Sequence, residues 1–71
     1  MTQEEKIELL AELFEVESAA IKPETSLTEL TWDSMTQLGL IALFRGEFSQ
    51  KLEAAKIRTF KTVGDILAEM P

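Results

Sequence analysis

The chain has 71 residues, of which 45% are apolar and 28% are charged, with no cysteine, no histidine and a formal net charge of −6. This composition is ordinary for a folded domain, and the length allows only one, which we expect to span residues 1–71. Without cysteine or histidine there is no disulfide, no thiolate or imidazole metal ligand, and no Ser-His or Cys-His nucleophile pair. The negative charge argues against nucleic acid as a partner, because phosphates require Lys and Arg.

The charge is concentrated in the first half of the chain. Residues 1–33 contain nine acidic and two basic residues, whereas residues 34–71 contain four acidic and five basic residues. Such a field would speed the approach of a partner with a basic surface, although a surface that serves only solubility is the alternative. No apolar run approaches the ~20 residues of a membrane span, and the acidic N-terminus is unlike a signal peptide. We expect a cytoplasmic protein and a monomer.

The first predicted element is a helix over residues 3–15. Thr2-Gln3-Glu4-Glu5 has the form of a capping box, in which Thr2 caps the helix and Glu5 reaches back to it. Apolar residues then recur at helical spacing, at Ile7, Leu10, Ala11 and Phe14. Residues 17–33 show no long periodic segment, and Lys22-Pro23 interrupts any helix there. We therefore predict a long connector, pinned to the bundle by Ile21, Leu27 and Leu30.

Three further helices are predicted in the second half of the chain. One begins near Ser34 and runs to about Glu47, with an apolar face at Met35, Leu38, Leu40 and Ile41 that Phe44 and Phe48 extend. A short helix follows at 53–58, with Ala54, Ala55 and Ile57 facing inward. Thr62 and Asp65 indicate a cap before the last helix, whose inner face is Val63, Ile66, Leu67 and Met70. The predicted fold is all-α, a small four-helix bundle with three main helices and one short helix.

Ser34 lies at the predicted first turn of the helix over 34–47. Backbone N–H groups at that place lack partners within the helix, and the helix dipole adds partial positive charge. A phosphate ester on Ser34 would therefore lie where helix N-termini favour anions. The alternative is a helix cap, because Asp-Ser before a helix is a common cap and Ser34 with Gln37 matches a capping box.

The chain resembles the acyl carrier protein family at three places. Leu27-Thr28-Glu29-Leu30-Thr31-Trp32-Asp33-Ser34-Met35 is similar to the family motif apolar-x-x-Leu-Gly-x-Asp-Ser-Leu. The apolar residues of the following helix have the family's positions, and Thr62-Val63-Gly64-Asp65-Ile66 resembles the family's opening of its last helix. The resemblance covers nearly the whole chain.

This resemblance implies a carrier rather than an enzyme. A phosphopantetheinyl transferase would attach 4′-phosphopantetheine from coenzyme A to Ser34, with Asp33 in a supporting role. The terminal thiol would hold an acyl or aminoacyl group as a thioester, for delivery to loading and transfer enzymes. Because the cofactor supplies the sulfur, a carrier chain needs no cysteine. We expect a set of residues around Ser34 to contact the partner enzymes: Trp32, Met35, Thr36, Gly39 and Ala42.

The chain also departs from the family pattern. Thr31 replaces the usual glycine, and Met35 replaces leucine. Positions that are often acidic in fatty acid carriers are occupied by Thr36, Gly39, Arg45 and Gly46. These departures favour a specialised polyketide, nonribosomal peptide or other acyl-transfer pathway, and partner binding that salt weakens less than for a highly acidic carrier.

Four phenylalanines could fill the small core, namely Phe14, Phe44, Phe48 and Phe60, which favours a short or polar cargo. The alternative function is a helical interaction module without a prosthetic group, in which exposed apolar residues bind a partner helix or groove. Carboxylates such as Glu4 and Glu8 lie on a solvated helix face, where they are not expected to act as catalysts.

Overall fold

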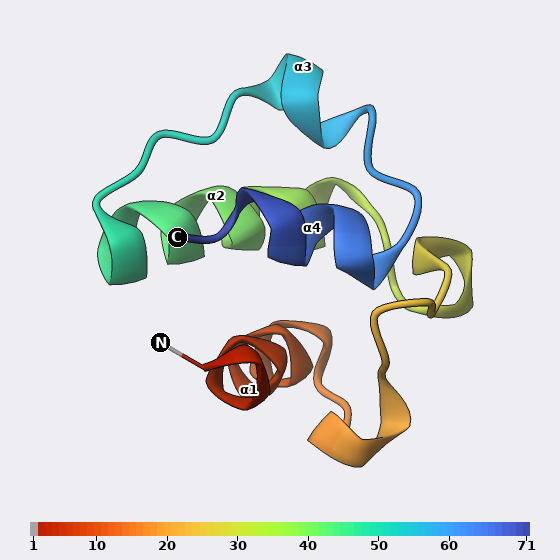
Figure 1. Cartoon of the computed structure of the whole chain (residues 1–71). Helices are drawn as coiled ribbons and strands as arrows, with labels where there is room; N and C mark the ends of the chain where they lie inside the picture. Colours follow the sequence, from red (N-terminus) through yellow and green to blue (C-terminus); the bar gives the residue numbers. More distant parts are fainter. Residues whose placement is uncertain (1) are drawn as a thin grey trace.

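The structure is a computed structural model that describes residues 2–71. Within these residues the chain forms α1 (Gln3–Phe14), α2 (Ser34–Phe48), α3 (Ala54–Ile57) and α4 (Val63–Glu69), with two short 3₁₀ helices, η1 (Ser18–Ala20) and η2 (Leu27–Glu29). α2 and α4 both lie on one side of α1, and α3 lies on their far side (Figure 1). The predicted bundle of three main helices and one short helix is confirmed. In the described part of the chain, no helix has the length and apolar character that crossing a bilayer requires.

Both ends of α1 are fixed by local hydrogen bonds. The predicted capping box is confirmed, because the Glu5 amide donates to the Thr2 hydroxyl and the Thr2 amide donates to the Glu5 carboxylate. At the other end Glu15 adopts a left-handed conformation, with φ 57°. The amide of Val16 donates to the carbonyl of Ala11 over 3.0 Å, which completes a Schellman-type ending. The helix therefore ends at Phe14, one residue before the predicted end.

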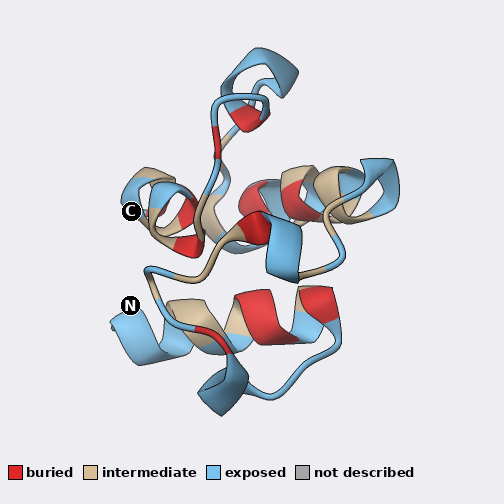
Figure 2. Cartoon of the chain, turned by 90° about the vertical axis from the view of Figure 1, so that its right-hand side faces the viewer, coloured by how far each residue is buried: buried red, intermediate tan, exposed pale blue. Residues whose placement is uncertain are grey.

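The core lies between α1, α2 and α4, where the buried faces of these helices meet (Figure 2). Three of the four phenylalanines are buried, namely Phe14, Phe44 and Phe60. The fourth, Phe48, is half-buried and meets the ring of Phe44 edge to face, with centroids 5.4 Å apart. The prediction that the four rings fill this core is therefore confirmed for three of them.

Three predicted core assignments are wrong, namely those of Leu38, Ala54 and Ala55. Leu38 is 64% exposed, although the apolar pattern assigned it to the inner face of the second helix. Met35, which was also among the predicted partner contacts, is 77% exposed. α2 is apolar on both sides, and its neighbours cover only the side that carries Leu40 and Phe44. Ala54 and Ala55 are also exposed, because α3 is a single turn that directs only Ile57 into the core.

The connector between α1 and α2 is tied to the beginning of α4. Ile21 and Leu27 are buried, as predicted, and Leu30 is half-buried. The amide of Val63 donates to Thr25 O over 2.9 Å, and the amide of Gly64 donates to Pro23 O over 2.7 Å. These bonds fix the path of the chain that leads to Ser34.

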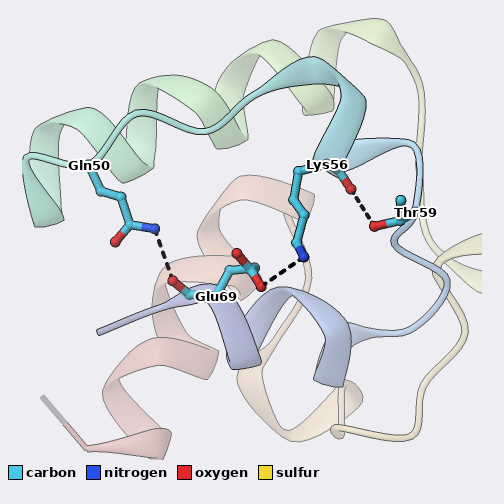
Figure 3. A network of polar contacts seen from close by, with 4 residues as sticks. All are labelled: Gln50, Lys56, Thr59 and Glu69. Carbon is cyan, nitrogen blue, oxygen red and sulfur yellow. Dashed lines mark hydrogen bonds and ion pairs between the residues drawn. The ribbon is translucent and has the colours of Figure 1, made fainter.

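The second connector, residues 49–62, is held against α4 by polar contacts. The side-chain amide of Gln50 donates to the carbonyl of Glu69 over 3.1 Å, and the Lys56 ammonium lies 3.4 Å from the Glu69 carboxylate (Figure 3). The hydroxyl of Thr59 donates to the Lys56 carbonyl. Together with buried Leu52 and Phe60, these contacts hold α3 over the bundle.

Candidate functional site at the start of α2

The first turn of α2 is capped by Asp33 and Thr36. The Thr36 amide donates to the Asp33 carboxylate over 3.0 Å, and the Asp33 amide donates to the Thr36 hydroxyl over 3.0 Å. The alternative capping box of Ser34 with Gln37 is therefore not formed, and Ser34 lies in the first turn as predicted. Because Asp33 provides the cap, Ser34 is the first residue of the helix itself. Its side chain is exposed and makes no hydrogen bond within residues 2–71, so the hydroxyl is free for modification.

Two backbone donors lie open beside this hydroxyl. The amides of Ser34 and Met35 occupy the first two positions of α2, where no carbonyl of the same helix can reach them. No other hydrogen bond engages them within the described residues. A 15-residue helix also concentrates partial positive charge at this end. An anionic phosphate ester on Ser34 would find donors and a favourable field here, so the residues fit the predicted group.

An apolar surface continues from Ser34 along the outer side of α2. Met35, Leu38 and Ala42 are all exposed, and their spacing of three and four residues places them on one face of the helix. Arg45 extends the same face. We call Met35, Leu38 and Ala42 the outer face of α2. Leu38 was absent from the predicted partner residues, because the dense apolar pattern of the helix assigned it to the core.

The other predicted partner residues lie at the border of this face. Trp32 is half-buried, and its ring lies 6.2 Å from that of Phe14 between centroids, so it anchors the connector to the core. Thr36 is half-buried and belongs to the cap. Gly39 faces α1, since a Cβ atom built there would lie 2.5 Å from Leu13 Cδ1. This contact favours close helix packing as the reason for glycine at position 39, and contact of these three residues with partners stays a prediction.

The carboxylates with a shifted pKa lie elsewhere. Hydrogen bonds from Thr2 lower the pKa of Glu5, and hydrogen bonds from the amides of Lys61 and Thr62 lower the pKa of Asp65. Both carboxylates serve as helix caps. Their shifts therefore have a structural cause and do not mark a site for acid or base chemistry.

Comparison with known proteins agrees with the geometry of this helix start. No curated protein matches the sequence significantly. A family model described as "Phosphopantetheine attachment site" matches residues 7–70, which is nearly the whole chain. The group that this family carries is covalently bound 4′-phosphopantetheine, in agreement with the predicted cofactor. The chain therefore belongs to the phosphopantetheine attachment site family and has the role of a phosphopantetheine carrier.

Proposed function

We propose that this protein is an acyl carrier whose 4′-phosphopantetheine is attached to Ser34. The arm's terminal thiol holds an acyl or aminoacyl group as a thioester, while the polypeptide presents that group to partner enzymes. The observation that carries this proposal is the exposed hydroxyl of Ser34 at the start of α2, within the segment matched by the family. The unengaged amides of Ser34 and Met35 support the same position for the phosphate.

Asp33 has a supporting role that follows from the helix cap. Its carboxylate accepts the amide of Thr36, which orders the first turn of α2 and leaves the Ser34 hydroxyl without a role in the cap. A phosphopantetheinyl transferase would meet a serine on rigid helical backbone rather than on a mobile loop. This preorganisation lowers the entropic cost of placing the hydroxyl for attack on coenzyme A.

The outer face of α2 is the proposed contact for loading and transfer enzymes. It begins directly beside Ser34 and presents Met35 and Leu38 to solvent, 77% and 64% exposed. Methionine adapts to differently shaped partners because its side chain is flexible and polarizable. The face carries no carboxylate, and the charged residue that extends it is Arg45. Apolar docking favours a specialised polyketide, nonribosomal peptide or other acyl-transfer pathway.

The packing of the core supports a short or polar cargo. Phe14, Phe44 and Phe60 are buried in it, and Phe44 is fully inaccessible to solvent. A long acyl chain could enter only by displacing these rings, which would disrupt the close packing of the core. NMR contacts between a long-chain acyl group and the methyl groups of buried Leu10 or Val63 would contradict this part of the proposal.

Loading with coenzyme A tests the attachment site. The protein is incubated with coenzyme A and a broad-specificity phosphopantetheinyl transferase, and its mass is measured. We expect the wild-type chain to gain one arm, Ser34→Ala to gain none, and the matched control Ser18→Ala to load fully, since Ser18 is exposed in η1. No gain by the wild type would favour the helical interaction module, whereas loading of Ser34→Ala would place the arm on another residue.

Transfer kinetics test the partner surface. We expect Leu38→Ser to slow transfer by a cognate enzyme about tenfold, while Ala55→Ser on exposed α3 leaves the rate unchanged. We also expect the wild-type rate to fall less steeply with salt than that of a carrier with an acidic second helix, because screening weakens exposed charge pairs most. Equal salt slopes for the two carriers would contradict the apolar docking.

A further inference from the structure

A groove runs along the surface of α1 and is not used by the site described above. Its volume is about 530 Å³, and its lining includes Leu9 and Val16. Val16 is 36% exposed, and Leu9 is half-buried. A smaller hollow of about 250 Å³ adjoins the groove, sharing Glu8 and Ser18 with it and adding Ile7. Apolar side chains thus remain open to solvent along one side of α1.

Four carboxylates border this groove. Glu5, Glu8 and Glu12 come from α1, and Glu47 comes from the last turn of α2. Within residues 2–71 none of the four takes part in an ion pair. The three glutamates of α1 follow one another at intervals of three and four residues, so they form a row about 10 Å long.

We propose that this groove binds a basic amphipathic helix of a partner protein. The apolar stripe of that helix would cover Leu9 and Val16, while its Lys or Arg side chains would pair with the carboxylates on the rim. A helix fits because its own side chains repeat at the three- and four-residue spacing of the glutamate row. Burial of the apolar floor supplies affinity, and the four negative charges select a partner of opposite charge.

The groove and Ser34 are far enough apart to be occupied together. Glu47 follows Ser34 by 13 residues in the same helix, which corresponds to about 20 Å along its axis. The two ends of α2 lie on opposite sides of the molecule (Figure 1). A partner held at the groove would therefore leave the start of α2 accessible. This inference does not depend on loading of Ser34.

A synthetic peptide tests the groove on the unmodified protein. The probe is a short helical peptide of Leu and Lys with its leucines on one face, and binding is followed by NMR shifts of the backbone amides. We expect the shifts to concentrate in α1, Ser18 and Glu47, and Ser34→Ala to bind the peptide as tightly as the wild type. Glu8→Gln/Glu12→Gln should weaken binding about fivefold, and Val16→Ser about threefold.

Two controls separate groove binding from general attraction between charges. Glu24→Gln/Glu53→Gln changes the net charge equally at exposed positions outside the groove and should alter affinity less than about twofold. A peptide of the same composition in scrambled order should bind at least tenfold more weakly, because it lacks an apolar face. Equal affinity for the two peptides, equal losses in the two double variants, or shifts on the outer face of α2 would each overturn the proposal. Thermal unfolding of every variant verifies that it is folded.

Discussion

The starts of α2 and α4 are built from the same capping device but have opposite surroundings. Asp33 and Thr36 cap α2 as Thr62 and Asp65 cap α4, with reciprocal hydrogen bonds in both. In α4 the amides of the first two helical residues, Val63 and Gly64, donate hydrogen bonds to the connector between α1 and α2. In α2 the corresponding amides, those of Ser34 and Met35, have no hydrogen-bond partner within residues 2–71, and the side chains beside them are exposed.

This difference separates a helix start whose donors are used by the fold from one whose donors are left open. The amides of Val63 and Gly64 at the start of α4 donate to Thr25 O and Pro23 O, so they are not available to another acceptor. The amide pair of α2 keeps its donors, which leaves that end free for an anion. Substitutions at matching positions of the two helices should therefore separate effects on stability from effects on loading.

The largest expected difference in stability between matching substitutions in α2 and α4 is at the first helical position. Val63 is fully buried, so Val63→Ala should lower the free energy of unfolding by about 2 kcal/mol through lost burial and a residual cavity. Ser34→Ala should change it by less than about 0.5 kcal/mol, because the side chain is exposed and unbonded. Urea unfolding followed by circular dichroism measures both. If Ser34→Ala lowered the free energy of unfolding as much as Val63→Ala, the proposed contrast between the two helix starts would be wrong.

The second helical position should show a smaller difference. A Cβ atom on Gly64 would lie 3.0 Å from Pro23 O, which is backbone and cannot move aside easily. We expect Gly64→Ala to cost about 1–2 kcal/mol by overpacking, offset only in part by the helix propensity of alanine. Met35→Ala should be neutral within about 0.5 kcal/mol, since Met35 is 77% exposed. Thermal unfolding midpoints test the pair, and a stabilising Gly64→Ala would contradict the close contact.

The two caps should be equal in strength. Asp33→Ala and Thr62→Ala each remove the side chain that accepts an amide of the first turn. Each should lower the free energy of unfolding by about 1 kcal/mol. The matched variant Ser34→Ala keeps the cap of α2 and should not show this loss. If Ser34→Ala were as destabilising as Asp33→Ala, the serine rather than the aspartate would be the cap.

The smallest expected effect is a dependence on pH at the start of α4. Hydrogen bonds from the amides of Lys61 and Thr62 lower the pKa of Asp65 in the folded state. A lowered folded pKa means that the carboxylate stabilises the fold above the unfolded value of about 3.9 and loses this effect as the pH falls through the folded value.

Unfolding midpoints of the wild type and Asp65→Asn, measured from pH 6 down to strong acid, test this effect. The difference in unfolding midpoint between the wild type and Asp65→Asn should be largest at pH 6 and should decrease on acidification. Glu24→Gln is the control, because Glu24 is exposed and has no hydrogen bond or ion pair within residues 2–71. This variant controls for the loss of one negative charge at the surface. A constant difference for Asp65→Asn would show that its carboxylate does not contribute through ionisation.

Local patterns in the sequence predicted where the helices begin and which serine stands at the start of α2. Capping boxes and helical spacing depend on residues three and four apart, so Thr2 with Glu5 and Thr62 with Asp65 could be identified without a fold. The alternative in which Ser34 itself caps α2 has the same origin. Asp33 and Ser34 are both good caps, and the sequence alone does not choose between neighbouring candidates.

Only the tertiary structure decided which apolar residues of α2 are covered. Leu38 and Leu40 have the same side chain two positions apart, yet Leu38 is 64% exposed and Leu40 is fully buried. An apolar helix presents several faces with equal hydrophobicity, and the packing of α1 and α4 selects one of them. The groove on α1 likewise depends on Glu47 and Ser18, which come from other elements. Sequence therefore determined the helices and the serine, whereas packing between helices determined the surfaces around them.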